Sequence, residues 1–171
     1  MNVIKAQMPD FPEILKLYSR SREFMAKNGN PTQWGSHYPP VELLEEDIAS
    51  GRLYVVRDPL GIHGVFAFLI GTDPTYLRID GAWHAQKTYG TIHRVASDGT
   101  GGVFSEILRF CWKQIPYLRI DTHEKNLVMR HVLEKNGFQY CGTILTDDGT
   151  PRRAYDRLDN DSCASGFFEC E

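Results

Sequence analysis

The segment Gly99-Thr100-Gly101-Gly102 is the part of the chain best suited to binding an anion. It follows directly on Ile92–Ala96, whose residues predict a short buried strand, and it leads directly into Val103–Ile115, whose spacing predicts an amphipathic helix. Glycines allow a sharp turn, and the first N–H groups of a helix favour negative charge. We therefore expect a phosphate cradle here, with a plain flexible turn as the alternative.

Spacing excludes several familiar motifs around this segment. A dinucleotide-binding fingerprint beginning at Gly99 needs a glycine where Phe104 stands, and no Gly-Lys pair follows to complete a P-loop. A nucleophile elbow at Ser97 needs a glycine where Val95 stands. The chain also contains no His-Glu-x-x-His motif for zinc.

A second informative segment is Leu118–Phe138. It contains a predicted strand that ends near Asp121, an asparagine that opens a helix at Asn126, and the closing run Glu134–Phe138. This pattern resembles the acetyl-CoA-binding half of the GNAT superfamily of N-acetyltransferases. The preceding strand, glycine loop and helix then correspond to the family's pyrophosphate-binding motif. The resemblance covers Asn2–Leu158.

The resemblance implies a mixed α/β fold in a single GNAT-like domain over residues 1–158. A central, mostly antiparallel, splayed sheet is expected, flanked by about four helices. The polar segment 159–171 is expected to be a mobile tail. The resemblance also implies acetyl-CoA as co-substrate, without a metal.

The same resemblance assigns cofactor contacts to particular positions. The backbone of Val95, Ala96 and Ser97 is expected to pair with the pantetheine arm. Asn126 is expected near the thiol-bearing arm and Lys135 near the phosphates, with a plain helix N-cap and a solvated charge as their alternatives. The N–H groups expected to hold the pyrophosphate belong to Gly99, Thr100, Gly101, Gly102, Val103 and Phe104.

The implied reaction is direct attack of a neutral amine on the thioester carbonyl. His93 is the candidate base because histidine side chains commonly accept protons near neutral pH, and the backbone N–H of Val95 is the candidate donor to the oxyanion. A packed strand histidine is the alternative for His93, and Asp80 or an ordered water competes for the role of base.

Two positions depart from the family pattern. The loop Asp98–Gly102 is less basic than is usual, which leaves the register of phosphate contacts open. The family's tyrosine acid, seven residues after the asparagine, is replaced by Leu133. Another donor or solvent must then protonate the departing thiolate. This replacement also keeps open a non-catalytic acyl-CoA sensor or regulatory module.

The acceptor is expected to be an amine of a small molecule or a peptide. Trp34 and Tyr38 could form an aromatic wall for it, or they could close the core. Asp80 is a further candidate for substrate contact. The acidic run of Glu42 and Glu45–Asp47 could attract a cation, with a solvated helix face as the alternative.

The remaining elements must position these residues. Hydrophobic periodicity and turn residues predict a mixed order of helices and strands. The helices are predicted from Phe11 to the break at Asn28–Pro31, at Val41–Ser50, at Val103–Ile115 and at Asn126–Asn136. The strands are predicted at Asn2–Ala6, Leu53–Arg57, Ile62–Ile70, Tyr76–Ala82, Ile92–Ala96, Tyr117–Asp121, Phe138–Leu145 and Arg152–Leu158.

Composition places the 171-residue chain among ordinary globular proteins, with 42% hydrophobic residues and a formal net charge of -3. That charge provides no field for gripping nucleic acid or an anionic membrane, so neither is expected as a partner. The four cysteines show no paired spacing, which argues against a zinc site or a disulfide framework. With no apolar run of signal or membrane length, we expect a cytoplasmic protein whose oligomeric state, including a homodimer, is open.

Overall fold

The computed structural model describes residues 1–159, which form two compact units. The first unit comprises Met1–Leu69 and Ile92–Phe110, and the second comprises Ile70–Thr91 and the described residues from Cys111 onward. Eight strands and four α-helices within this range confirm the mixed α/β class. The predicted mobile tail, 159–171, lies outside the described residues except for its first residue. No described helix is long and apolar enough to cross a membrane.

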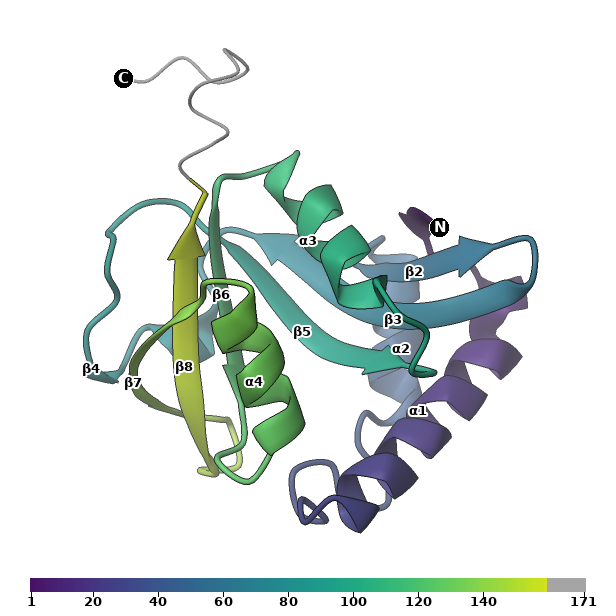
Figure 1. Ribbon diagram of the computed structural model, residues 1–171, viewed down its shortest axis with the longest axis horizontal. Helices are drawn as coiled ribbons and strands as arrows, with labels where there is room; N and C mark the ends of the chain where they lie inside the picture. The colour runs from purple at the N-terminus through teal and green to yellow at the C-terminus, as the bar shows by residue number, and fades with distance from the viewer. Residues whose placement is uncertain (160–171) are drawn as a thin grey trace. The chain divides into compact units, whose positions relative to one another are not determined.

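The first unit carries the strand order β1-β2-β3-β5 with three helices (Figure 1). Strands β1 and β2 pair antiparallel, as do β2 and β3. The β2–β3 hairpin turns where the Asp58 carboxylate accepts the Leu60 N–H at 2.8 Å. The elements of the first unit are β1 (Asn2–Lys5), a 3₁₀ helix (Met8–Asp10), α1 (Phe11–Lys27), α2 (Val41–Ala49), β2 (Leu53–Asp58), β3 (Gly61–Ile70), β5 (Gly90–Ser97) and α3 (Val103–Trp112).

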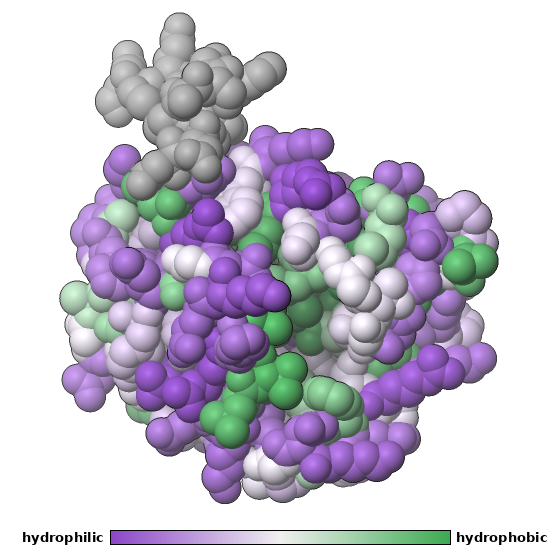
Figure 2. Space-filling view, viewed as in Figure 1, coloured by the Kyte–Doolittle hydropathy of each residue, from purple (hydrophilic) through white to green (hydrophobic). Residues whose placement is uncertain are grey.

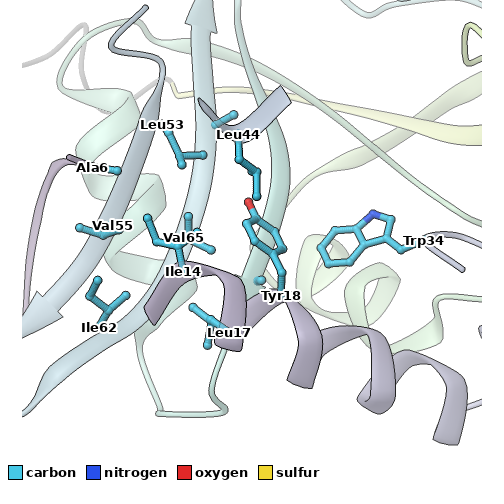
Figure 3. Packing of buried hydrophobic residues seen from close by; sticks show 12 residues of the cluster. Ala6, Ile14, Leu17, Tyr18, Trp34, Leu44, Leu53, Val55, Ile62 and Val65 are labelled. Carbon is cyan, nitrogen blue, oxygen red and sulfur yellow. The ribbon is translucent and has the colours of Figure 1, made fainter. Parts of the chain in front are cut away.

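Helices α1 and α2 cover one face of these strands (Figure 3). Ile14 and Tyr18 of α1 and Leu44 of α2 pack with Val55 and Val65 of the strands, and all five are fully buried. Burying side chains of this size contributes about 2 kcal/mol each. This cluster is a hydrophobic core of the first unit.

Helix α3 covers the opposite face. Phe110 packs against the rings of Tyr54 and Phe66, with centroids 4.8 and 6.0 Å apart. At the other end of α3, a Cβ added at Gly64 would lie 2.4 Å from Val103 Cγ1. A glycine at position 64 therefore allows the start of α3, which follows the glycine loop, to approach β3.

The second unit carries the strand order β6-β8-β7-β4, with antiparallel pairing at each step. Hydrophobic side chains gather at the surface over the lower end of α4, where Leu127 and Val128 are exposed (Figure 2). The elements are a 3₁₀ helix (Pro74–Tyr76), β4 (Asp80–Gly81), β6 (Tyr117–Thr122), α4 (Leu127–Lys135), β7 (Gln139–Leu145) and β8 (Pro151–Leu158).

An aromatic cluster forms the core of the second unit around one buried cation. The guanidinium of Arg119 lies 4.1 Å from the ring of Trp83 and 3.9 Å from that of Tyr89. It also donates a 3.0 Å hydrogen bond to the carbonyl of Ala85. Cation–π contacts and this bond replace the water that Arg119 loses on burial.

The predicted strand Tyr76–Ala82 is wrong over most of its length. Tyr76 ends a 3₁₀ helix that begins at Pro74, and only Asp80–Gly81 pairs as a strand. The reason is local, because the Asp73 side chain accepts the N–H of Thr75 at 2.9 Å and so favours a helical turn. Of the hydrophobic residues at the start of the predicted strand, Tyr76 is buried and Leu77 is exposed.

Candidate functional site

Strand β5 is kinked at Arg94, immediately before the backbone predicted to contact the cofactor. Arg94 has φ 54°, the left-handed region that non-glycine residues rarely adopt. The buried hydroxyl of Tyr18 donates a 2.8 Å hydrogen bond to the Arg94 carbonyl. Burial raises the pKa of Tyr18 well above its usual value, so the hydroxyl stays a donor. The kink is therefore held in place by the core.

The Arg94 side chain anchors the same kink to helix α2. Its guanidinium pairs with the carboxylate of Asp47, which is 1% exposed and also faces Arg52 Nε at 3.5 Å. Burial alone would lower the pKa of Arg94, but Asp47 and Tyr38 raise it. A buried pair of this kind is costly to break, because the remaining charge is left without a partner.

The predicted catalytic positions flank this kink. His93 and Val95 are each partly exposed in a strand whose neighbouring residues, Ile92 and Ala96, are buried. A left-handed residue interrupts the regular alternation of a strand, which explains this exposure in mid-strand. The structure thus brings the predicted base and the predicted oxyanion donor to one distorted stretch of β5.

The predicted cradle follows as an exposed loop between β5 and α3. Gly99 and Gly102 have φ angles of 91° and 86°, which side chains rarely tolerate. A Cβ added at Gly99 or Gly101 would meet nothing within 4 Å, so the space above the loop is open. The N–H of Glu106 bonds to the Gly102 carbonyl, and the preceding N–H groups at the start of α3 have no helical partner. The arrangement can hold a phosphate through its backbone.

His63 on β3 clamps the start of this loop, which the sequence did not indicate. Its Nδ1 lies 2.9 Å from Asp98 Oδ2, and its Nε2 lies 2.9 Å from Asp58 Oδ1. The Asp98 carboxylate also accepts the N–H of Thr100 at 2.9 Å. The hydrogen bonds to Asp98 and Asp58 raise the pKa of His63. A protonated His63 offsets the Asp98 charge, which would otherwise repel a phosphate.

The two aromatic residues predicted for the substrate have different environments. Trp34 is 8% exposed and meets the Tyr18 ring edge-on, with centroids 5.6 Å apart. It belongs to the hydrophobic core. Tyr38 packs against Trp34 at 6.2 Å and is 39% exposed. Of this pair, Tyr38 is the residue that presents an aromatic surface to solvent.

The acidic run on α2 also divides in two. Glu42, Glu45 and Glu46 are exposed, as the solvated-face interpretation requires, whereas Asp47 is buried against Arg94. A pattern of charge alone does not distinguish these cases, because the partner of Asp47 lies on a strand distant in the sequence.

The other predicted site residues belong to the second unit. Asn126 caps helix α4 by accepting the Met129 N–H at 3.1 Å, so its structural role as an N-cap is confirmed. Lys135 is exposed in the last turn of α4, and Asp80 is exposed on β4. Leu133, at the family's tyrosine position, is fully buried.

Solved structures resemble this fold over almost its whole length. An acetyltransferase of the GNAT family from Streptococcus agalactiae is 30% identical, with 92% of this chain and 94% of that chain covered and a TM-score of 0.82. One from Listeria monocytogenes is 20% identical over 91% of this chain and 93% of its own, with a TM-score of 0.64.

A third structure, N-acetylglutamate synthase from Neisseria gonorrhoeae complexed with coenzyme A and N-acetylglutamate, is 16% identical. It covers 93% of this chain but 35% of its own, with a TM-score of 0.57. No protein-family model matches the chain, and no curated protein matches it in sequence.

Proposed function

Because the chain belongs to the GNAT family of acetyltransferases, we propose that it transfers the acetyl group of acetyl-CoA directly to a primary amine. The acceptor is a small molecule or a peptide. The observation that carries this proposal is the open glycine loop between the kinked strand β5 and helix α3, clamped by His63. A neighbour of the same fold is complexed with coenzyme A, which supports acetyl-CoA as the donor.

The residues present fit such a co-substrate. Backbone N–H groups of Gly99–Phe104 are proposed to hold a pyrophosphate, although those of Gly99 and Thr100 already donate to Ser97 and Asp98. The partly exposed backbone at Val95 is proposed to pair with the amides of a pantetheine arm. Ala96 and Ser97 continue that backbone contact toward the loop. Asn126 and Lys135 remain predicted contacts of acetyl-CoA from the family resemblance.

The proposed reaction requires a proton acceptor for the amine and a hydrogen-bond donor for the oxyanion. The amine nitrogen forms a bond to the acetyl carbon, the carbon–sulfur bond breaks, and the sulfur leaves as a thiolate. His93 is the proposed acceptor of the amine proton, with Asp80 as the competing residue. The Val95 N–H is the proposed donor to the oxyanion. Leu133 cannot protonate the thiolate, so solvent or another donor does so. A thiolate is an adequate leaving group near neutral pH without a dedicated acid.

The acceptor is proposed to approach the exposed ring of Tyr38. This ring offers a flat apolar surface, and aromatic rings attract ammonium groups. Because Trp34 lies in the core behind Tyr38, it supports the ring rather than lining the acceptor site.

The test is release of coenzyme A thiol from acetyl-CoA over a panel of polyamines, aminoglycosides, amino acids and peptides. We expect acceptor-dependent release with at least one class, and a slower rate with an altered pH profile for His93→Ala. A His93→Ala enzyme with unchanged rate and pH profile would assign the base elsewhere.

The buried Leu133 favours one other candidate, a non-catalytic acyl-CoA sensor. That function predicts tight acetyl-CoA binding without thiol release on any amine. The same panel therefore separates the two functions.

A further inference from the structure

A polar cluster in the second unit brings together three side chains with donor atoms that metals use. His84 Nδ1 lies 2.7 Å from Asp156 Oδ1 and 3.4 Å from Cys141 Sγ. The three donor atoms lie within 4.8 Å of one another. Asp156 and Cys141 are buried at 2% and 7% exposure, whereas the His84 side chain is 49% exposed.

Two features of the backbone bring these side chains together. Strand β7 bulges between Tyr140 and Gly142, so Cys141 has no partner in the register with β8 and its side chain is re-aimed. Gly81 and Gly142 then let β4 approach β7 closely, because a Cβ on either would lie about 2.1–2.2 Å from a backbone oxygen. His84 follows β4 by three residues, and the close approach holds it beside the bulge.

The geometry is not that of a catalytic Cys–His–Asp triad. In a triad, one ring nitrogen of the histidine faces the nucleophile and the other faces the carboxylate. Here the same atom, His84 Nδ1, faces both Cys141 Sγ and Asp156 Oδ1. Three donor atoms that lie within 4.8 Å of one another are close enough to be ligands of one ion.

The second oxygen of Asp156 is tied to the protein. Its Oδ2 accepts the hydroxyl of Tyr117 at 2.6 Å and the backbone N–H of His84 at 2.9 Å. Supporting bonds of this kind orient a carboxylate so that its other oxygen can serve as a single ligand. Oδ1 is the oxygen that faces the histidine.

We propose that His84, Cys141 and Asp156 form a site for one zinc ion. Zinc accepts nitrogen, sulfur and oxygen ligands together, and three protein ligands leave a fourth position for water on the exposed side of His84. Tetrahedral zinc sets nitrogen and sulfur ligands about 3.5 Å apart, close to the separation of Nδ1 and Sγ. Nδ1 and Oδ1 must separate to about 3.4 Å, a shift of under about 1 Å for a half-exposed ring.

Zinc at this site joins the loop after β4 to strands β7 and β8. Because the ion binds the folded arrangement of ligands, it raises the stability of the protein. Sequence spacing predicted no zinc site because the three ligands come from separate elements, 57 and 72 residues from His84.

The test is titration of the full chain with zinc chloride, in which calorimetry measures binding and thermal unfolding measures stability. The background carries Cys163→Ser and Cys170→Ser, so that the remaining thiols are Cys111 and Cys141. We expect binding of one zinc per chain and a higher Tm. With cobalt chloride, we expect a thiolate-to-metal absorption band. Cys141→Ala and His84→Ala should each weaken zinc binding by more than about tenfold.

The controls are Cys111→Ser, the other buried thiol, and His131→Ala, an exposed histidine on α4, and both should bind zinc normally. If Cys141→Ala does not fold, His84→Ala decides alone, because its half-exposed side chain contributes less to packing. Failure of the parent to bind one zinc ion overturns the site, as does unchanged zinc affinity in His84→Ala.

Discussion

The glycine loop Asp98–Gly102 and the His84–Cys141–Asp156 cluster are built in opposite ways. The loop offers backbone N–H groups, is exposed, and occupies one short stretch of the chain. The cluster offers side-chain donors, is mostly buried, and draws on three separate elements. A backbone site depends on the conformation of the chain, whereas a side-chain site depends on individual donor atoms. The two should therefore fail under different substitutions.

The largest expected effect concerns the buried pair that anchors the kink before the loop. Asp47→Asn leaves the Arg94 guanidinium without its counter-charge, and we expect a loss of about 3–5 kcal/mol in the free energy of unfolding. Urea unfolding measures this loss. The matched control is Glu46→Gln on the same helix, whose exposed pair with Arg52 contributes at most about 1 kcal/mol. If both substitutions lowered the free energy of unfolding equally, the buried Asp47–Arg94 pair would not stabilise the protein as described.

The next effect concerns the close approach of β4 and β7. Gly142→Ala places a Cβ 2.1 Å from the Asp80 carbonyl oxygen, at φ 142°. We expect a loss of about 3 kcal/mol in unfolding free energy, from the steric clash and from backbone strain together. Gly149→Ala, at φ 78° with nothing within 4 Å, carries the strain alone and should lose about 1–2 kcal/mol. A Gly142→Ala protein as stable as Gly149→Ala would contradict the packing described for this pair.

A smaller effect should separate two glycines of the loop. Gly102→Ala strains the chain at φ 86°, whereas Gly101→Ala adds a methyl group in open space without a left-handed φ. We expect Gly102→Ala to weaken acetyl-CoA binding about tenfold, equivalent to about 1.4 kcal/mol. Gly101→Ala should weaken it less. Calorimetric Kd values measure both, and a reversed order would show that side-chain space governs the loop.

The smallest effect concerns pH and the clamp at His63. Because hydrogen bonds to Asp98 and Asp58 raise its folded-state pKa, protonated His63 contributes fully to stability below its unfolded pKa of about 6.5. This contribution is lost as the pH rises through the raised pKa. Urea midpoints measured from pH 6 upward should therefore fall in the wild type and less so in His63→Gln. If the urea midpoints of the two proteins changed with pH in parallel, protonated His63 would not stabilise the loop.

The carboxylates of the clamp titrate in the opposite sense. A hydrogen bond from His63 lowers the pKa of Asp58. Burial acts to raise the pKa of Asp98, but hydrogen bonds from His63 and Thr100 leave it lowered. Their contribution is present above the unfolded pKa of about 3.9 and is lost as the pH falls through the lowered values.

Sequence patterns predict most of the fold because they are local. Hydrophobic spacing places α1 and the β2–β3 hairpin within a few residues of their observed ends, and glycines mark the loop before α3. The prediction fails at Tyr76, where a side-chain cap decides the backbone. The pattern of hydrophobic residues alone does not show whether such a segment forms a strand or a turn capped by a side chain.

The contacts around the candidate site that the sequence does not reveal are long-range. His63 meets Asp98 across 35 residues, and Arg94 meets Asp47 across 47. Neither pairing leaves a spacing rule to detect, since the partners come together through strand pairing and helix packing. Trp34 shows the converse, because an aromatic residue in a loop looks available for ligands until its place in the core is known.

Thermal unfolding with and without acetyl-CoA tests directly whether the protein binds this co-substrate through its glycine loop. If the glycine loop binds acetyl-CoA, Tm should rise with acetyl-CoA, equivalent to about 2.7 kcal/mol when its concentration is about one hundred times Kd. The rise should shrink in Gly102→Ala and remain largely intact in Gly101→Ala. An unchanged Tm of the wild type at saturating acetyl-CoA would contradict the account.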